Sequence, residues 1–305
     1  MSSETLEFDT HFDPAHGVAV PVAPFVTRVT ADNGGPFTFR GTNSYVVGGP
    51  DAVVVVDPGP DDTRHLAALL SAIACRPVAA ILLTHTHRDH TALVPQLKAA
   101  TGAPVIAEGP HRAARSLHAG ETNLMDAAGD TGLTLDRLIA DGERFALPGL
   151  DITAVATPGH TANHLALEIG GTGTLLSGDH VMAWSTTVVA PPDGSMGDFM
   201  ASLDRLLERD DTLHLPGHGG PVARPRPFLR ALRAHRRMRE SAILERLRVG
   251  DRQIPAIVAA IYRNTDPRLL GAAGLSVLAH LEDLVARGLV VSEGPPLIGS
   301  AFRPA

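Results

Sequence analysis

One stretch, Ile-Leu-Leu-Thr-His-Thr-His-Arg-Asp-His at residues 81–90, decides the fold of this chain. Residues 77–83 form a short, mostly apolar run, which is typical of a fully buried strand. A helix-like segment begins at about Thr91, so residues 84–90 lie in a strand-to-helix loop. Loops at the carboxyl ends of strands usually hold the chemistry of α/β folds.

This loop contains four potential metal ligands within six residues: His85, His87, Asp89 and His90. His85 and His87 alternate, so their side chains point the same way in an extended turn. Asp89 and His90 follow the bend toward the helix and are better placed for a second ion. A polar loop with chance histidines is the alternative, because the chain contains 15 histidines. Further ligands at later strand ends argue against it.

Three later turns repeat the pattern of an apolar strand that ends in a ligand-capable residue. They are Pro158-Gly159-His160, Gly178-Asp179 and Pro216-Gly217-His218. Glycine directly before each ligand lets the backbone turn sharply and approach a metal without a side-chain clash. Each turn alone is a weak signal, but together they add three ligands to the four in the loop.

These residues resemble the metallo-β-lactamase superfamily. Residues 84–90 fit its His-x-His-x-Asp-His loop without a departure, and the three later ligands follow in the family's order. The resemblance covers roughly residues 18–225 and implies an α/β (α+β) fold, a four-layer αββα sandwich with a dinuclear site at one edge of the sheets. By that resemblance the first metal is bound by His85, His87 and His160, the second by Asp89, His90 and His218, and Asp179 bridges them.

The donor set predicts a hydrolase with two divalent metal ions as cofactors, zinc first, with iron or manganese as alternatives. Two such ions share a water, lower its pKa and hold it as the bridging hydroxide that attacks a carbonyl carbon or a phosphorus. The same ions stabilise the charge that develops on the substrate oxygen. True β-lactamases of this family commonly carry cysteine at the position of Asp179. Aspartate here therefore argues against antibiotic hydrolysis. It favours the thioesterase, ribonuclease and phosphodiesterase branches of the family.

Two more residues are expected to act near the metals. Asp57 follows a buried strand, and we expect it to orient a ligand or its loop; a turn aspartate is the alternative. His164 is a candidate catalytic residue, either as a hydrogen-bond donor behind the ligands or as a proton source for the leaving group. Asp89, at the second ion, is the other catalytic candidate. A local hydrogen bond at the start of a strand is the other interpretation of His164. Residues 108–141 show only a weak helical period, so we expect loops and short helices near the site there.

The composition shift near residue 224 divides the chain into a hydrolase domain at 1–225 and a helical linker with a winged-helix-like module at 226–305. Residues 223–252 contain ten arginines against three acidic residues, although the whole chain has a net charge of −7. Three helical patterns and a strand, at 254–262, 266–270, 275–287 and 289–291, have the order of a winged helix. Such modules bind nucleic acid through the third helix and the wing. Here the third helix carries Glu282 and Asp283, so packing, dimerisation or formation of a substrate channel are the alternatives.

A metallo-β-lactamase domain followed by a winged helix resembles the β-lactamase-like protein 2 group. Residues 41–45, 157–161, 216–219 and 235–237 have counterparts in that group. Its animal members are taken to be single-strand-specific endoribonucleases, which makes single-stranded RNA the first expected substrate. The alternative is a hydroxyacylglutathione-type thioesterase of the glyoxalase II branch, which shares all seven ligands. A non-catalytic nucleic-acid-binding protein is an alternative of another class, and seven intact ligands argue against it.

The remaining features indicate a compartment. Cys75 is the single cysteine, which excludes an internal disulfide and agrees with a reducing cytoplasm; its place after an apolar helix predicts a buried side chain. The first residues include acids and lack both a basic region and an apolar core, so no secretory signal is expected. We find no run of about 18 apolar residues, so no membrane span is expected. The sequence therefore predicts a cytoplasmic enzyme without a membrane partner and leaves its oligomeric state open.

Overall fold

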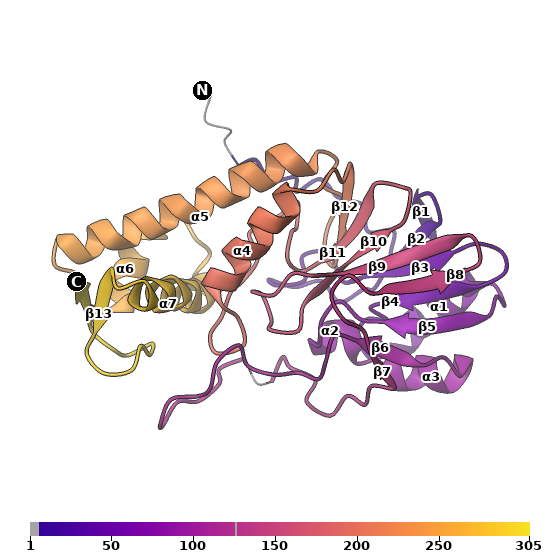
Figure 1. The fold of residues 1–305 in the computed structure, drawn as a ribbon, viewed down its shortest axis with the longest axis horizontal. Coiled ribbons are helices and arrows are strands. Elements are labelled where there is room, and N and C mark those ends of the chain that lie inside the picture. Colours follow the sequence, from indigo (N-terminus) through magenta and orange to yellow (C-terminus); the bar gives the residue numbers. More distant parts are fainter. Residues whose placement is uncertain (1–5, 126) are drawn as a thin grey trace.

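The computed structural model describes residues 6–125 and 127–305. Its main domain contains two β-sheets that lie face to face between helices (Figure 1). Seven strands form the first sheet in the order β1-β2-β3-β4-β5-β6-β7, and five strands form the second in the order β12-β11-β10-β9-β8. A hairpin of β13 and β14 belongs to a helical C-terminal module, which lies at the far end of the molecule from the first sheet (Figure 1).

The elements follow one another closely along the chain. The first sheet consists of β1 Val20–Ala23, β2 Val26–Thr30, β3 Asn43–Gly48, β4 Val53–Val56, β5 Val78–Leu82, β6 Val105–Ala107 and β7 Arg137–Leu138. The other strands are β8 Arg144–Leu147, β9 Leu150–Ala156, β10 Leu165–Ile169, β11 Thr174–Gly178, β12 Leu213–Pro216, β13 Val290–Ser292 and β14 Phe302–Pro304. The helices are α1 Thr63–Ile73, α2 Arg88–Thr91, α3 Val94–Thr101, α4 Met196–Leu207, α5 Pro225–Arg248, α6 Ile254–Ile261 and α7 Leu270–Ala286, with a short 3-10 helix η1 at Pro267–Leu269.

Strand β4 shows how the sequence builds two layers of core. Val54 and Val56 pack between the two sheets, whereas Val53 and Val55 join the cluster that contains the inward side chains of α1 and α3. Successive side chains of a strand point to opposite faces, so a strand that is covered on both sides needs apolar residues at every position. Four buried valines in a row therefore make β4 an interior strand.

Apolar stripes hold the outer helices against the sheets. On α1 the buried side chains His65, Leu69 and Ile73 recur every four residues and face the first sheet. On the other side of the sandwich, Phe199 of α4 and Leu232 of α5 pack in one cluster with side chains of the second sheet. The layers are thus helix, sheet, sheet and helix, which confirms the expected αββα sandwich.

The C-terminal module is built from the end of α5, α6, α7 and the β13–β14 hairpin around an apolar cluster of its own. The order agrees with a winged helix, except that residues 266–270 form a 3-10 turn that continues into α7 rather than a separate helix. Helix α7 also packs against α4 of the main domain. Every residue from Ala273 to Leu281 is buried, so the third helix of the module lies inside the molecule.

The segment η1–α7, Pro267–Ala286, is long and apolar enough to cross a membrane by length and composition alone. In the structure its apolar side chains instead fill the contact between the module and the main domain. Two local expectations are wrong. Cys75, for which the sequence predicts a buried side chain, is exposed, since it follows the left-handed turn that ends α1. The described part of 108–141 contains β7 and loops but no helix.

Candidate metal centre

All seven ligand-capable residues lie together at one edge of the sandwich, on the loops that follow β5, β9, β11 and β12. The loop after β5 supplies His85 and His87 before α2 begins, and the first turn of α2 supplies Asp89 and His90. The side chains of His85 and His87 therefore point in a different direction from those of Asp89 and His90. The structure brings together every ligand that the sequence predicts.

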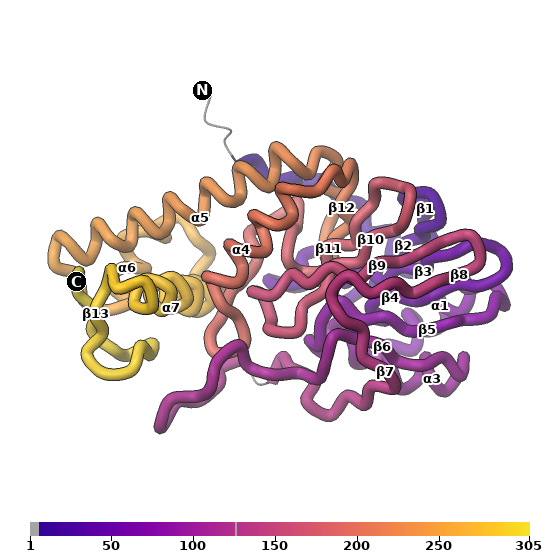
Figure 2. Tube along the Cα trace, in the orientation of Figure 1, coloured from indigo at the N-terminus to yellow at the C-terminus, as the bar shows by residue number. Residues whose placement is uncertain are grey.

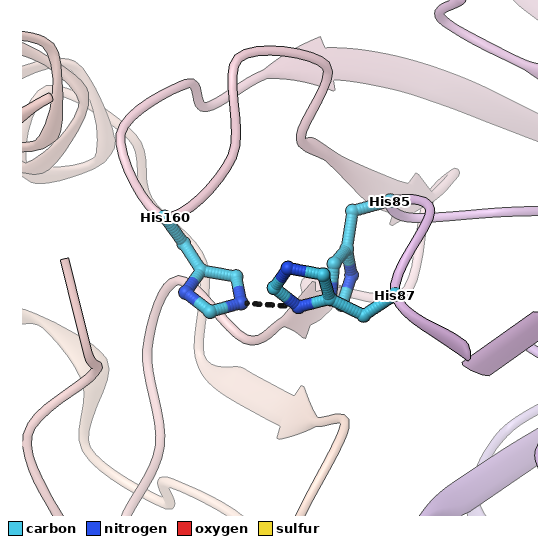
Figure 3. A group of neighbouring side chains, drawn as sticks. All are labelled: His85, His87 and His160. Carbon is cyan, nitrogen blue, oxygen red and sulfur yellow. Dashed lines mark hydrogen bonds between the residues drawn. The ribbon is translucent and has the colours of Figure 1, made fainter. Parts of the chain in front are cut away.

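Three histidines form the first ligand group. Nδ1 of His87 lies 3.2 Å from Nε2 of His85 and 3.1 Å from Nε2 of His160. Figure 3 shows the three rings converging from the loop after β5 and the loop after β9. Tetrahedral zinc with bonds of about 2.0–2.1 Å to nitrogen separates its ligand nitrogens by about 3.3 Å. The observed spacing fits one divalent ion.

Asp89, His90 and His218 form the second ligand group. Nε2 of His90 and Nε2 of His218 are 3.3 Å apart, and Oδ2 of Asp89 lies 3.2 Å from the latter. Asp179 lies between the two groups, with its Oδ2 3.3 Å from Nε2 of His218 and 3.8 Å from Nε2 of His160. A carboxylate that reaches both groups has the position that a bridging ligand requires.

The hydrogen bonds on the outer side of the rings show which atoms face the centre with a lone pair. The Nδ1–H of His160 donates to the carbonyl oxygen of Val188 at 2.7 Å, and the Nδ1–H of His218 donates to that of Gly41 at 3.2 Å. A neutral imidazole with one N–H has its lone pair on the other nitrogen. Lone pairs and carboxylates that converge at about 3 Å repel one another unless a cation lies between them. Oδ1 of Asp179 is also buried without a hydrogen-bond partner among the described residues. The donor set therefore fits divalent metal ions.

The site shifts the pKa values of its own groups when no metal is bound. Burial works to lower the pKa of His218, but Asp179 and Asp89 outweigh it and raise this pKa to about 9. Burial also opposes ionisation of Asp179, yet His218 and His90 hold its pKa well below the usual range. Protons thus occupy the place of cations between these carboxylates, and metal binding must release them.

Asp57 lies directly behind both ligand groups. Its Oδ1 accepts the backbone N–H of Thr84 at 2.8 Å, and its Oδ2 accepts the hydroxyl of Thr84 at 2.6 Å and the Nδ1–H of His90 at 3.1 Å. The same hydroxyl accepts the Nδ1–H of His85 at 3.0 Å. One carboxylate thus orients a ring of each group, directly or through a hydroxyl, which is the geometry that an orienting residue needs.

His164 lies behind the ligands and does not line the cavity described below. Its Nδ1–H donates to the hydroxyl of Thr157 at 2.8 Å, and its Nε2 accepts the backbone N–H of Asp179 at 3.1 Å. Burial lowers the pKa of His164 well below its usual range, so the ring stays neutral. Both nitrogens are committed inside the protein. His164 therefore positions Asp179 and is not available as the proton donor that the sequence predicts.

Glycine before a ligand has the expected reason at Gly217. A Cβ atom at this position would lie 2.4 Å from Oδ1 of Asp179 and 2.7 Å from Cε1 of His90. At Gly159 the backbone has a φ of +138°, and a Cβ atom would lie 2.4 Å from the Cα atom of Phe199. Any other residue at either position would displace a ligand or the helix behind it.

A polar network that the sequence does not reveal supports the loop after β5. The hydroxyl of Thr86 accepts the side-chain N–H of Asn163 at 2.8 Å and lies 3.1 Å from Nδ1 of His111. Nε2 of His111 in turn lies 3.3 Å from Oδ2 of Asp193. His111 belongs to a segment without a clear period, so no sequence signal separates it from the other histidines of the chain.

A cavity of about 540 Å³ extends from the ligand groups to the C-terminal module. His87, Asp89 and Asp179 border it at the metal centre. Its apolar wall comes from both domains and includes Phe8, Phe37, Met125, Met182, Trp184, Leu269, Ala272 and Leu275. The end of η1 and the first turns of α7 are thus part of the wall. This agrees with the alternative in which the winged helix helps to form a substrate channel.

Known proteins match both parts of the chain. Residues 37–218 match the family model of the Metallo-beta-lactamase superfamily, and residues 254–295 match that of the Beta-lactamase associated winged helix domain. A Beta-lactamase-like protein 2 homolog of Drosophila melanogaster is 30% identical over 285 residues, which cover 87% of this chain and 91% of the relative. An Atrochrysone carboxyl ACP thioesterase of Claviceps purpurea (strain 20.1) is 29% identical over 225 residues, 73% of this chain and 65% of the relative.

A solved structure has a similar fold over nearly the whole chain. It is a Beta-lactamase domain protein from Burkholderia ambifaria, with a TM-score of 0.79 over 96% of this chain and 95% of that chain at 24% identity. The superfamily match spans more than half of the chain and contains all seven ligand-capable residues. The chain therefore belongs to the metallo-β-lactamase superfamily and is a metal-dependent hydrolase with a C-terminal winged-helix domain.

Proposed function

We propose that the protein hydrolyses an acyl thioester, with two divalent ions, zinc first, held by the two ligand groups and Asp179. The observation that carries the proposal is the cavity, because the ligand groups open into a pocket whose lining is mostly apolar. Its volume of about 540 Å³ lies within the range of small-molecule pockets. Apolar walls favour an acyl or aromatic group. The relative named as a thioesterase supports the same chemistry.

The residues that border the cavity at the metal centre indicate how such a substrate would be oriented. His87, Asp89, His160, Asp179 and His218 border the cavity, so the thioester carbonyl belongs there and the acyl group lies along the apolar wall. When bound, divalent ions supply hydroxide at neutral pH and stabilise the negative charge that develops on the carbonyl oxygen. Asp89 and Asp179 offset part of the positive charge of those ions, and Asp57 and His164 keep ligand rings and backbone in place.

The leaving group also favours a thioester over a phosphodiester. A thiol has a pKa of about 8.5, so a thiolate departs without a proton, whereas the alkoxide released from RNA needs a proton donor. His164, the donor expected from the sequence, is buried and has both nitrogens committed. Hydrolysis of a thioester does not require another proton donor in place of His164.

Single-stranded RNA is the second candidate substrate, and the exposed arginines of α5 favour it. The surplus is smaller than the count of arginines indicates, since four of the ten pair with carboxylates. These pairs are Arg226 with Asp210, Arg233 with Asp204, Arg246 with Asp251 and Arg248 with Glu245. Helix α7, which a winged helix would place on nucleic acid, is mostly buried. RNA would have to rely on Arg224, Arg230, Arg237 and Arg252, which are exposed.

A two-substrate assay on protein of measured metal content tests the proposal. Hexanoyl-N-acetylcysteamine and a labelled single-stranded RNA are each incubated with the wild type, Asp179→Ala and Asp210→Ala, in which an exposed aspartate is replaced. We expect thioester hydrolysis that disappears in Asp179→Ala, together with most of the metal, and persists in Asp210→Ala. RNA cleavage without thioester hydrolysis would contradict the proposal and establish the second candidate. Fully metal-loaded protein that cleaves neither substrate would contradict both.

A further inference from the structure

Two arginines of α5 differ from all the others in that helix. Most of the others pair with carboxylates or are exposed, as described above. Arg236 and Arg239 instead line the cavity that begins at the ligand groups. They are three positions apart and so lie on one face of the helix. Among the described residues, neither forms an ion pair with a carboxylate.

Arg236 is a buried cation without an acidic neighbour among the described residues. Only 3% of the surface of Arg236 is exposed. It donates a hydrogen bond to the carbonyl oxygen of Thr187, and its Cζ lies 4.9 Å from the ring centroid of Phe199. Its Nε has no hydrogen-bond partner among the described residues. Burial lowers the pKa of Arg236 to about 10, so the group remains charged at neutral pH.

Arg239 extends the same arrangement by one turn. Its Cζ lies 4.7 Å from the ring centroid of Tyr262, and one N–H donates to the carbonyl oxygen of Ile261 at 3.4 Å. Its Nε is also buried without a partner among the described residues. His235 lines the cavity beside them, and burial together with the two arginines lowers its pKa to about 4, so it is neutral. The region therefore contains two positive charges and no compensating acid.

A buried charge without a counter-charge is costly, and two like charges add their repulsion. The cost disappears when an anion completes the arrangement, since guanidinium groups bind carboxylate and phosphate through paired hydrogen bonds. We propose that Arg236 and Arg239 form an anion-binding subsite of the cavity, which takes a carboxylate or phosphate group of the substrate. The inference rests on the proposed function and narrows its substrate class to acyl thioesters that carry an anionic group away from the reacting carbonyl.

The backbone at residues 187–188 connects this subsite to the metal centre. The carbonyl oxygen of Thr187 accepts a hydrogen bond from Arg236, and the next carbonyl, that of Val188, accepts one from His160 at 2.7 Å. A ligand ring and a subsite guanidinium are thus held by adjacent peptide groups, and both side chains line the same cavity. One substrate molecule spans the two, with its thioester at the metal centre and its anion at the arginines.

Matched substrates test the subsite. Succinyl and butyryl thioesters of the same thiol have equal chain lengths and differ in a terminal carboxylate. We expect Arg239→Gln to lower kcat/KM for the succinyl thioester by about tenfold or more, mainly through KM, because a charged hydrogen bond is lost. The loss on the butyryl thioester should be much smaller, because it has no terminal carboxylate to bind. Arg237→Gln, a change at an adjacent exposed arginine, is the control and should affect neither substrate. Equal loss on both substrates, or no loss on either, would overturn the subsite.

Thermal denaturation gives a second readout that does not need turnover. Succinate and inorganic phosphate are added separately to the metal-loaded wild type, Arg239→Gln and Arg237→Gln, which distinguishes the two sources of the anion. A ligand that binds only the folded protein raises Tm. We expect one of the two anions to raise Tm of the wild type and Arg237→Gln but not of Arg239→Gln; an anion held by the metals alone would stabilise all three equally and overturn the subsite. Absence of thioester turnover together with the expected Tm pattern would contradict only the proposed function.

Discussion

At the scale of a single residue, Asp57 contacts both ligand groups, one directly and the other through the hydroxyl of Thr84. Its backbone has a φ of 50°, which lies in the left-handed region that non-glycine residues seldom adopt. Such a conformation costs about 1–3 kcal/mol and persists where the surroundings hold it in place. Here three hydrogen bonds from Thr84 and His90 hold the carboxylate. Asp57 is therefore both a turn residue and the residue that orients the ligand rings. The two interpretations of Asp57 from the sequence do not exclude each other.

Replacing Asp57 by asparagine separates these contributions. Asparagine tolerates the left-handed conformation, so the backbone is preserved. Its amide nitrogen donates and cannot accept from both the hydroxyl of Thr84 and the ring of His90. We expect metal affinity to fall by about 10–100-fold, measured by titration against a competing chelator. Asp61→Asn, at an exposed neighbour, should bind metal as the wild type does. Unchanged affinity in Asp57→Asn would reduce Asp57 to a turn residue.

Helix α7 shows at the scale of an element how a polar residue is accommodated in an apolar interface. His280 is 2% exposed, and neither ring nitrogen has a hydrogen-bond partner among the described residues. Burial lowers its pKa to about 3, and the nearby charges of Arg236 and Arg287 act in the same direction. The ring is therefore neutral at pH 7, and taking up a proton in the folded protein would cost further stability.

The pH dependence of stability follows from this shift. The unfolded chain binds a proton at His280 below about pH 6.5, whereas the folded protein resists it down to about pH 3. Between these values stability falls as pH falls, by about 1.4 kcal/mol per pH unit. We expect His280→Met to lose less stability than the wild type between pH 7 and about pH 4.5, in urea denaturation of metal-free protein. His11→Met, at a fully exposed histidine, serves as the control. Equal acid sensitivity of His280→Met and the wild type would contradict the assignment.

At the scale of the whole molecule, one loop of the main domain makes a further contact with the winged helix. Figure 2 shows the segment after β6 leaving the first sheet and running toward α7. Arg115 in this segment pairs with Glu121 of the same segment at 2.7 Å and with Glu282 of α7 at 2.5 Å. The acidic residue that argues against nucleic-acid contact by α7 thus has a partner in the main domain.

Removal of this ion pair should loosen the module. Arg115→Ala leaves Glu282, whose side chain is 16% exposed, without its cationic partner. We expect a loss of about 1–3 kcal/mol in the free energy of unfolding and a higher KM, since α7 lines the cavity. Arg112→Ala breaks a more exposed pair with Glu108 in the same segment and should cost about 0–1 kcal/mol. Denaturation curves and thioester kinetics provide the comparison. Similar small losses in both variants would show that the ion pair does not hold the module.

Local pattern by itself determined the metal centre of this protein. Each ligand follows the end of an apolar strand, in the loop or in the helical turn that comes next, and the residue types and spacing that define such ends are properties of a few neighbouring residues. Asp57 is found for the same reason. Only the tertiary structure decided what lies around the centre. The bond from His164 to Asp179, the pair of Arg115 with Glu282 and the burial of α7 join residues from different elements. A count of arginines predicts a basic surface, but side-chain packing decides which of them are paired, which are exposed and which two face the cavity.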